Sequence, residues 1–206
     1  MKTIGITGII GSGKSTVCHI FEHLGIPVYY SDGHAKQAYL NPQVLERVQQ
    51  VFGTAVAGAD GRLDMARLAD IVFADKQKLQ QLNSIVHPWV KEDFLAWKQR
   101  QNAPYILFES AIIFECGFED WFDEIIVVNT PEKEIVERVK ARSHISQAEI
   151  QRRLDNQQII RRHIPEVRFV IDNAEQTMVL PQILAIDKII RDELRNHRTS
   201  YIHIGI

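Results

Sequence analysis

Eight residues near the N-terminus have the types and spacing of a phosphate-binding loop. Gly8 to Ser15 read G-I-I-G-S-G-K-S, which matches the pattern G-x-x-x-x-G-K-S. Glycines at these positions let successive backbone N–H groups point at phosphate oxygens. The residues predicted to contact a nucleoside triphosphate are Gly11, Ser12, Gly13, Lys14, Ser15 and Thr16.

Two side chains of this loop have predicted chemical roles. Lys14 is expected to reach the β- and γ-phosphates as a positive charge, and the Ser15 hydroxyl to bind the Mg²⁺ ion that bridges them. The loop needs a strand before it and a helix after it. An apolar run at 3–7 predicts the strand, and apolar residues at helical spacing over 17–24 predict the helix.

Three acidic residues follow other predicted strands. Asp32 lies just beyond a strand at 27–30, where it could take or orient the proton of an acceptor hydroxyl; alternatively, Ser31 or Asp32 caps the next helix. Glu109 ends a buried strand at 105–108 and could hold Mg²⁺ through water. Glu115 could contact substrate or be a solvated acid.

The region from about 34 to 103 has helical rather than strand patterns. Asn41-Pro42 begins a predicted helix, a turn is predicted at 57–61, and a second helix covers 65–73. A third helix, over 79–86, is predicted to close at Pro88, so that two helices meet at a corner at His87. Such a block between two strands is typical of an acceptor-binding lobe, although the corner by itself suggests only structure.

Charge is distributed unevenly along the chain. The net charge is −2, yet residues 138–168 contain eight basic and three acidic side chains, a local charge of +5. A basic segment is what a lid over a triphosphate needs, and Arg142 at its entrance is the strongest candidate. A capping-box sequence, Ser146-x-x-Glu149, predicts a helix over 147–162. The alternative is a solvated basic face.

Length and composition limit the function classes. The 206 residues allow one globular unit or a core with an insert, and the small net charge argues against a nucleic-acid or membrane partner. Two cysteines without metal-ligand spacing, and the absence of a long apolar run, favour a cytoplasmic protein. Two GTPase patterns are missing: N-K-x-D, which reads guanine, and D-x-x-G, which senses the γ-phosphate. Their absence disfavours a signalling GTPase and favours a small phosphotransferase.

Further motifs extend over residues 3–185 and together resemble the dephospho-CoA kinase family. They are T-G-x-x-G-S-G-K-S at 7–15, L-G-I-P-V at 24–28, N-x-x-x-H-P at 83–88, I-I-F-E at 112–115, E-R-V-K-A-R at 137–142, R-L-x-x-Q at 153–157 and V-I-D-N at 170–173. The resemblance implies transfer of the ATP γ-phosphate to the 3′-hydroxyl of dephospho-CoA, with Mg²⁺. It also implies that Asp32 is the base and that His87 and Glu115 lie on the CoA side.

The expected fold is α/β, a P-loop kinase core with a parallel five-stranded sheet. Residues 1–30 and 104–206 are predicted to form the core, 31–103 the acceptor lobe and 141–166 the lid, with Arg138 and Arg142 contacting nucleotide. Four positions depart from the family pattern: Ile9 for Gly, Tyr30 for Asp, Glu109 for Asp and Ala111 for Pro. Two other functions stay open: a kinase of another small alcohol or of a nucleoside monophosphate, and a non-catalytic ATP-binding regulator.

Overall fold

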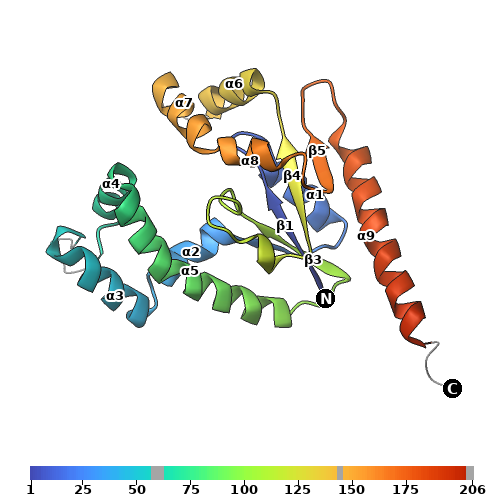
Figure 1. The fold of residues 1–206 in the computed structure, drawn as a ribbon, viewed down its shortest axis with the longest axis horizontal. Helices are drawn as coiled ribbons and strands as arrows, with labels where there is room; N and C mark the ends of the chain where they lie inside the picture. The colour runs from blue at the N-terminus through green and yellow to red at the C-terminus, as the bar shows by residue number, and fades with distance from the viewer. Residues whose placement is uncertain (57–62, 143–145, 203–206) are drawn as a thin grey trace. The chain divides into compact units, whose positions relative to one another are not determined.

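A computed structural model describes residues 1–56, 63–142 and 146–202 (Figure 1). The turn predicted at 57–61 and the part of the predicted lid at 143–145 lie outside these residues. Internal contacts divide the chain into two units. The first comprises Met1–Tyr29 and Gln101–Ile206, and the second comprises Tyr30–Arg100.

A five-stranded sheet forms the centre of the first unit. Its strands, in spatial order, are β2 (Val28–Tyr30), β3 (Tyr105–Glu109), β1 (Lys2–Thr7), β4 (Glu124–Asn129) and β5 (Phe169–Asp172). β1 pairs in parallel with both β3 and β4, and β4 pairs in parallel with β5. The predicted fold class is therefore confirmed. With β1 in the middle, the loop that follows it has a neighbouring strand end on each side.

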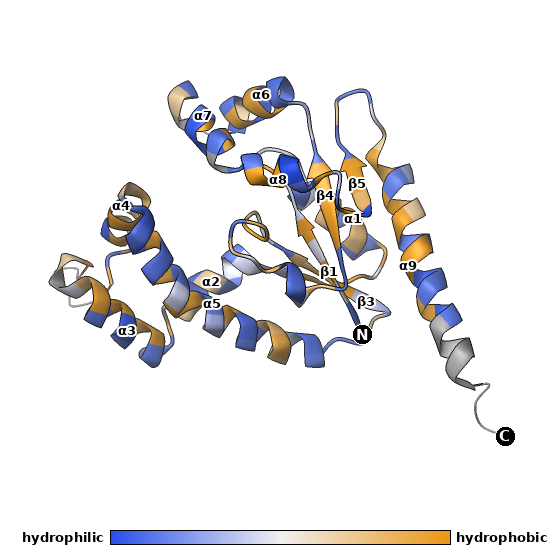
Figure 2. Cartoon of the chain, in the orientation of Figure 1, coloured by the Kyte–Doolittle hydropathy of each residue, from blue (hydrophilic) through white to orange (hydrophobic). Residues whose placement is uncertain are grey.

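The strands are apolar along most of their length because both faces of the sheet are covered (Figure 2). Ile4 and Ile6 of β1 and all residues of β3 are buried. Burial on both faces explains why the strands could be predicted from the sequence. A strand that is buried on both faces needs apolar residues at successive positions, and these appear as a continuous apolar run.

Five helices flank or extend the sheet in the first unit: α1 (Lys14–His23), α6 (Glu132–Arg142), α7 (Gln147–Asn156), α8 (Gln158–His163) and α9 (Val179–Ile202). α9 packs against α1 and β5, whereas α6, α7 and α8 lie beyond the carboxyl ends of the strands (Figure 1). The prediction of one helix over 147–162 is wrong, because the helix is interrupted at Gln157, between α7 and α8.

The second unit consists of α2 (Ser31–Ala38), α3 (Pro42–Phe52), a 3₁₀ turn (Gly53–Val56), α4 (Met65–Ala74) and α5 (Lys76–Gln99). The long helix α5 packs against α2, α3 and α4. Side chains cap three of these helices: Asn41, Asp64 and Asp75 each accept hydrogen bonds from backbone N–H groups of the first turn.

The predicted corner at Pro88 is wrong. α5 continues through Pro88 to Gln99, because the apolar face on either side of the proline is buried in the same unit. Proline removes one hydrogen bond of the helix and would normally end it. Here Pro88 is on the exposed side, so the carbonyl that loses its partner can bind water. Tertiary packing therefore outweighs the local preference.

No helix in the described part of the chain combines the length and the apolar character needed to cross a membrane.

Candidate active site

The loop between β1 and α1 has the backbone conformation of an anion cradle. Gly11 and Gly13 have φ values of 77° and 91°, in the left-handed region that favours glycine. Gly13 is also the N-cap of α1, and no side chain caps this helix. The first N–H groups of α1 therefore remain available to a ligand, and the helix dipole adds partial positive charge there.

Two glycines of the loop also touch their neighbours closely. A Cβ atom at Gly8 would lie 2.5 Å from the Val128 carbonyl oxygen and 2.6 Å from Ser12 Oγ. A Cβ atom at Gly13 would collide with the Asn173 side chain. Side chains at these positions would thus push the loop away from the sheet and fill the space where its backbone curls.

Two side chains from other elements hold the loop at the Ser12 carbonyl oxygen. Asn173 Nδ2 donates to it at 2.7 Å, and Thr130 Oγ1 donates to it at 3.0 Å. Thr130 follows β4 and Asn173 follows β5, so both lie at the carboxyl end of the sheet. A threonine before a proline, as in Thr130-Pro131, is typical of a helix cap. The structure instead gives its hydroxyl a loop carbonyl as partner.

Lys14, Ser15 and Thr16 form the first turn of α1. Lys14 Nζ donates to the Gly8 carbonyl oxygen at 2.7 Å, so the ammonium lies folded back over the loop. Ser15 and Thr16 are exposed. The Ser15 hydroxyl and the Lys14 ammonium are therefore close to the free backbone N–H groups at the start of α1.

Glu109 lies at the carboxyl end of β3, paired in register with Ile6 of β1, and is 9% exposed. It is electrostatically coupled to the loop helix. The pKa of the Cys18 thiol in α1 is raised, mainly by burial and next by the negative charge of Glu109, while Lys14 lowers it. The Glu109 carboxylate and the Lys14 ammonium both change the pKa of the Cys18 thiol, so both charges lie near this thiol.

Glu115 also belongs to this neighbourhood. Its pKa is raised, chiefly because surrounding atoms exclude water from the carboxyl, whereas the charges of Lys14 and His163 oppose the rise. The adjacent Phe114 ring stacks on the His163 ring with 4.2 Å between centroids. The loop after β3 therefore contacts the end of α8.

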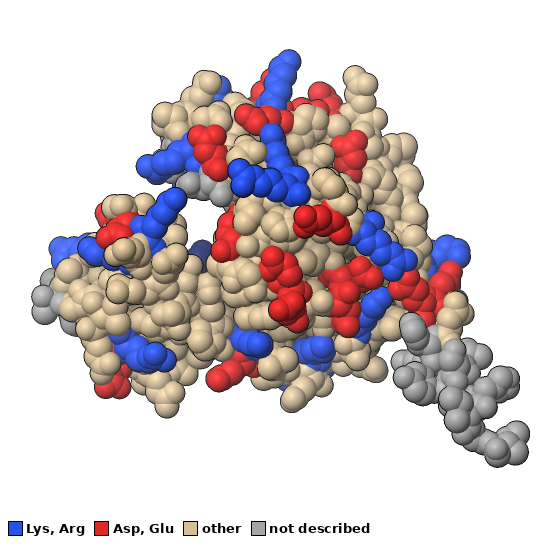
Figure 3. Space-filling model, viewed as in Figure 1, with Lys and Arg blue, Asp and Glu red and all other residues tan. Residues whose placement is uncertain are grey.

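The basic segment is partly structural. Within the described residues, at least three of its eight basic side chains form ion pairs; they join Arg138 to Glu134, Arg161 to Glu132 and Arg168 to Glu124, at N···O distances of 2.9, 2.9 and 3.1 Å. Arg138 also donates to the Asn173 carbonyl oxygen at 2.9 Å. Figure 3 accordingly shows acidic side chains among the basic ones.

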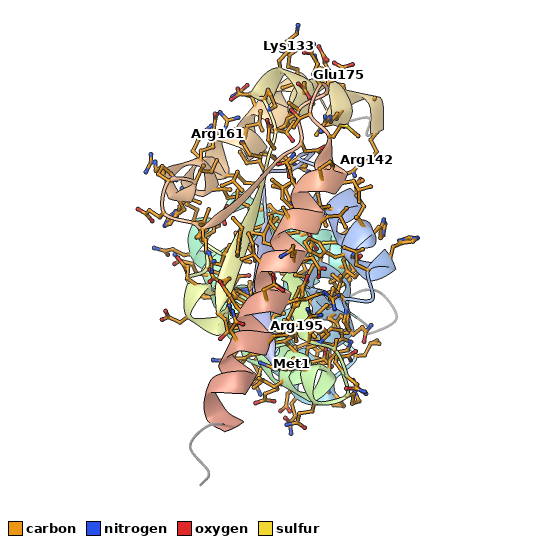
Figure 4. The ribbon with its side chains drawn as sticks, turned by 90° about the vertical axis from the view of Figure 1, so that its right-hand side faces the viewer. Met1, Lys133, Arg142, Arg161, Glu175 and Arg195 are labelled. Carbon is orange, nitrogen blue, oxygen red and sulfur yellow. The ribbon has the colours of Figure 1, made fainter. Side chains whose placement is uncertain are left out.

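Arg142 differs from these paired arginines. It is exposed at the end of α6, and no hydrogen bond or ion pair engages it within the ranges 1–56, 63–142 and 146–202. In Figure 4, Arg142 of α6 lies on the right and the paired Arg161 of α8 on the left. Within the described residues, the Arg142 guanidinium is therefore available to an incoming anion, as is that of the exposed Arg162 on α8.

The remaining predicted site residues, Asp32 and His87, belong to the second unit. Asp32 is exposed in the first turn of α2. The N-cap of α2 is Tyr30, without a side-chain capping bond, so the alternative in which Ser31 or Asp32 is the cap is wrong. His87 lies on α5, and burial lowers its pKa. On α2, His34 Nδ1 lies 2.7 Å from Asp93 Oδ2 of α5.

Three residues that contact the loop were not predicted as site residues: Thr130, Asn173 and Gln157. Gln157 Oε1 accepts a hydrogen bond from the Ile10 backbone N–H at 2.8 Å. Asn173 and Gln157 lie within sequence motifs noted above, but the motifs do not show which atoms these side chains contact and therefore did not indicate their roles. One consideration could have pointed to them. Loop N–H and carbonyl groups that do not face the ligand need hydrogen-bond partners in the protein, and polar side chains near the strand ends are candidates for that role.

Taken together, the first unit offers free helix N–H groups, an ammonium and an exposed hydroxyl at one loop and a buried carboxylate at the end of the neighbouring strand. It also has, within the described residues, an unpaired guanidinium at the end of α6. These groups suit binding and transfer of a phosphoryl group. Among the described residues, no three His, Cys, Asp or Glu side chains cluster as a metal site. A cation here would depend on a hydroxyl, water and the phosphates themselves.

Comparison with known proteins gives consistent findings. Residues 2–178 match the family model described as dephospho-CoA kinase. A dephospho-CoA kinase of Porphyromonas gingivalis is 37% identical over 203 residues, covering 95% of this chain and 98% of the relative. One of Bacteroides fragilis is 37% identical over 185 residues, covering 89% and 90%. The crystal structure of TT1252 from Thermus thermophilus superimposes with a TM-score of 0.81 at 35% identity, covering 94% and 97%.

Proposed function

Since this chain belongs to the dephospho-CoA kinase family, we propose that it transfers the γ-phosphate of ATP to the 3′-hydroxyl of the ribose of dephospho-CoA, the last step of coenzyme A synthesis. The observation that carries the proposal is the family match over residues 2–178, which includes the whole phosphate-binding loop and the strand ends around it. We also infer that the protein acts in the cytoplasm, where free thiols such as Cys18 and Cys116 persist.

In this proposal the loop binds the triphosphate of ATP. The N–H groups of Gly11 and of Gly13 to Thr16 contact phosphate oxygens, because the left-handed glycines orient the loop and the start of α1 adds positive charge. The Ser12 N–H donates to the Ile9 carbonyl oxygen at 3.0 Å and holds the turn. Lys14 exchanges the Gly8 carbonyl oxygen for a phosphate oxygen, which is favourable because the new partner carries a full charge.

Mg²⁺ fits the donor set around the loop. Ser15 offers an exposed hydroxyl oxygen, and Glu109 offers a buried carboxylate beside the loop helix that would bind through water. Hard oxygen ligands with several waters are the set that Mg²⁺ prefers. When bound, the ion neutralises phosphate charge. Because Glu is longer than the Asp usual in this family, its carboxylate reaches one methylene farther from β3.

Arginines assist transfer by offsetting the charge that develops on the phosphoryl group. Arg142 is the exposed, unpaired candidate at the end of α6, and 141–166 would form the lid. Arg138 has a second task, because Glu134 and the Asn173 carbonyl hold its guanidinium in place. We infer that Arg138 shapes the nucleotide side of the loop and that Arg142 contacts the phosphates.

The second unit would supply the acceptor side, with 31–103 as the lobe. Asp32, exposed at the start of α2, orients the 3′-hydroxyl and accepts its proton as the phosphoryl group moves. His87 and Glu115 contact the CoA moiety. The lowered pKa of His87 keeps its imidazole neutral near pH 7, so it acts as a hydrogen-bonding group and not as a cation.

The test is ADP release by the purified protein with ATP and Mg²⁺, measured separately with dephospho-CoA, AMP, shikimate, gluconate and no acceptor. The proposal expects rapid ADP release with dephospho-CoA alone. Activity only on another acceptor would replace the substrate assignment, and ATP binding without turnover on any acceptor would indicate a regulator.

A further inference from the structure

We propose that Gln157 is a positioning residue that couples the predicted lid to the phosphate-binding loop. Its side chain links the corner between α7 and α8 to the loop backbone, because Oε1 accepts from the Ile10 N–H at 2.8 Å. A donor N–H requires oxygen as its partner, so this contact also fixes which way the amide group is turned. The hydrogen bond itself does not depend on the proposed function, whereas the effect of Gln157 on ATP binding rests on it.

The helix break at Gln157 gives the side chain its position. The backbone N–H of Gln157 is shared between the carbonyls of Arg153 and Leu154, and its φ and ψ are −99° and 13°. A continuous helix would rotate the following residues away from this geometry. The interruption of the predicted helix thus places Gln157 at a corner, where a glutamine is long enough to reach the loop.

An apolar cluster surrounds the contact. It contains Ile9 from the loop, Phe114 from the segment after β3, Ile135 and Val139 from α6, Ile150 and Leu154 from α7 and Ile160 from α8, with Ile10 packed against it. Ile9 is only 4% exposed. The hydrogen bond between Ile10 and Gln157 is itself half-buried, so this apolar cluster shelters the Ile10 N–H from water on one side.

The loop is consequently held from two directions. Thr130 and Asn173, at the ends of core strands, fix the Ser12 carbonyl, whereas Gln157 fixes the Ile10 N–H. Between these two points lies Gly11, whose left-handed backbone has few alternatives. A displacement of the α7–α8 corner would therefore turn the Ile9–Ile10 peptide group, which precedes the Ile10–Gly11 peptide group, and change the loop that is proposed to bind the triphosphate.

The experiment compares Gln157→Met, Gln157→Glu and the neighbouring control Gln158→Met. Gln158 begins α8 and has no side-chain hydrogen bond within the described residues. Hydrogen exchange of the Ile10 amide is measured without ligand, and KM for ATP and for dephospho-CoA is measured by ADP release. Methionine keeps the length of the side chain but removes the acceptor, while glutamate keeps the acceptor.

We expect Gln157→Met to accelerate Ile10 exchange and to raise KM for ATP, each by about tenfold, the value of one sheltered hydrogen bond. KM for dephospho-CoA should stay within about twofold. Gln157→Glu should restore slow Ile10 exchange, and Gln158→Met should leave all three quantities unchanged.

Unchanged Ile10 exchange in Gln157→Met, or equal effects from Gln158→Met, would overturn the proposal. So would failure of Gln157→Glu to restore protection. If dephospho-CoA is not phosphorylated at all, the exchange data and a direct ATP titration still test the coupling, so failure of the proposed function is distinguishable from failure of this one.

Discussion

The Ser12 carbonyl oxygen has two side-chain donors, and removing them one at a time tests how the loop is stabilised. Asn173→Ala removes the donor at 2.7 Å, and Thr130→Val removes the donor at 3.0 Å with little change of volume. In each single variant the other donor still satisfies the carbonyl. In the double variant the oxygen has neither donor. Water cannot easily replace them, because Ser12 is only 1% and Thr130 only 3% exposed.

The expected magnitudes follow from this arrangement. Each single substitution should lower the free energy of unfolding by about 1 kcal/mol, the net value of a neutral hydrogen bond. The double variant adds the penalty of an unsatisfied buried carbonyl, about 1–3 kcal/mol. Its total loss should therefore be roughly 3–5 kcal/mol, more than the sum of the single variants, with a coupling of about 1–3 kcal/mol.

Urea denaturation of the four proteins measures these free energies, and calorimetric titration with ATP reports the same loop in its functional state. We expect affinity for ATP to fall about fivefold in each single variant. Asn102→Ala, in an exposed position after α5, is the matched control. Strictly additive losses, or single variants as unstable as the double variant, would refute the reasoning that the two donors share one acceptor.

Three further predictions concern other parts of the molecule. Asp32→Asn should lower turnover by about 10²-fold while leaving ATP affinity nearly unchanged, as measured by ADP release and titration; full turnover would exclude a role as base. Ile9→Ala should lower the free energy of unfolding by about 3 kcal/mol because Ile9 of the loop is buried against α6, α7 and α8, whereas a loss below about 1 kcal/mol would contradict that packing. Burial places the pKa of His87 below its ordinary value of about 6.5, so its contribution to stability is present above that pH and is lost as pH falls through the folded pKa. Urea midpoints measured between pH 7 and 5 should therefore fall less steeply in His87→Gln than in the unmodified protein, and equal slopes would count against burial as the cause.

The sequence predicted the elements whose signal is local. The loop needs glycine where φ is positive, and its pattern therefore located the cradle, the strand before it and the helix after it. Asn41 and Gly53 likewise marked the ends of α3, because a capping side chain and a left-handed glycine are chemical requirements of helix ends.

Contacts between distant segments could not be predicted in this way. Pro88 has the local signature of a helix end, yet the apolar face on both sides of it keeps α5 continuous. Thr130 has the signature of a cap, yet its hydroxyl donates to a carbonyl 118 residues away. At the break between α7 and α8, Gln157 accepts from the Ile10 N–H, and nothing in the sequence around Gln157 shows where that donor lies.

The charge pattern gave a mixed result for the same reason. In the described residues, most of the +5 segment lies on α6, α7 and α8, but a sequence cannot show which arginines already have acidic partners. Arg138, Arg161 and Arg168 are paired in the structure, and Arg142 is left exposed. The role of Arg142 in phosphoryl transfer stays a prediction.

The central claim is the identity of the acceptor atom, and phosphorus NMR of the reaction product tests it most directly. Incubation of the protein with ATP, Mg²⁺ and dephospho-CoA should yield ADP and one new phosphomonoester signal, coupled to the proton at the 3′ position of the ribose. A signal coupled to the 2′ proton, or free phosphate with unchanged dephospho-CoA, would contradict the account.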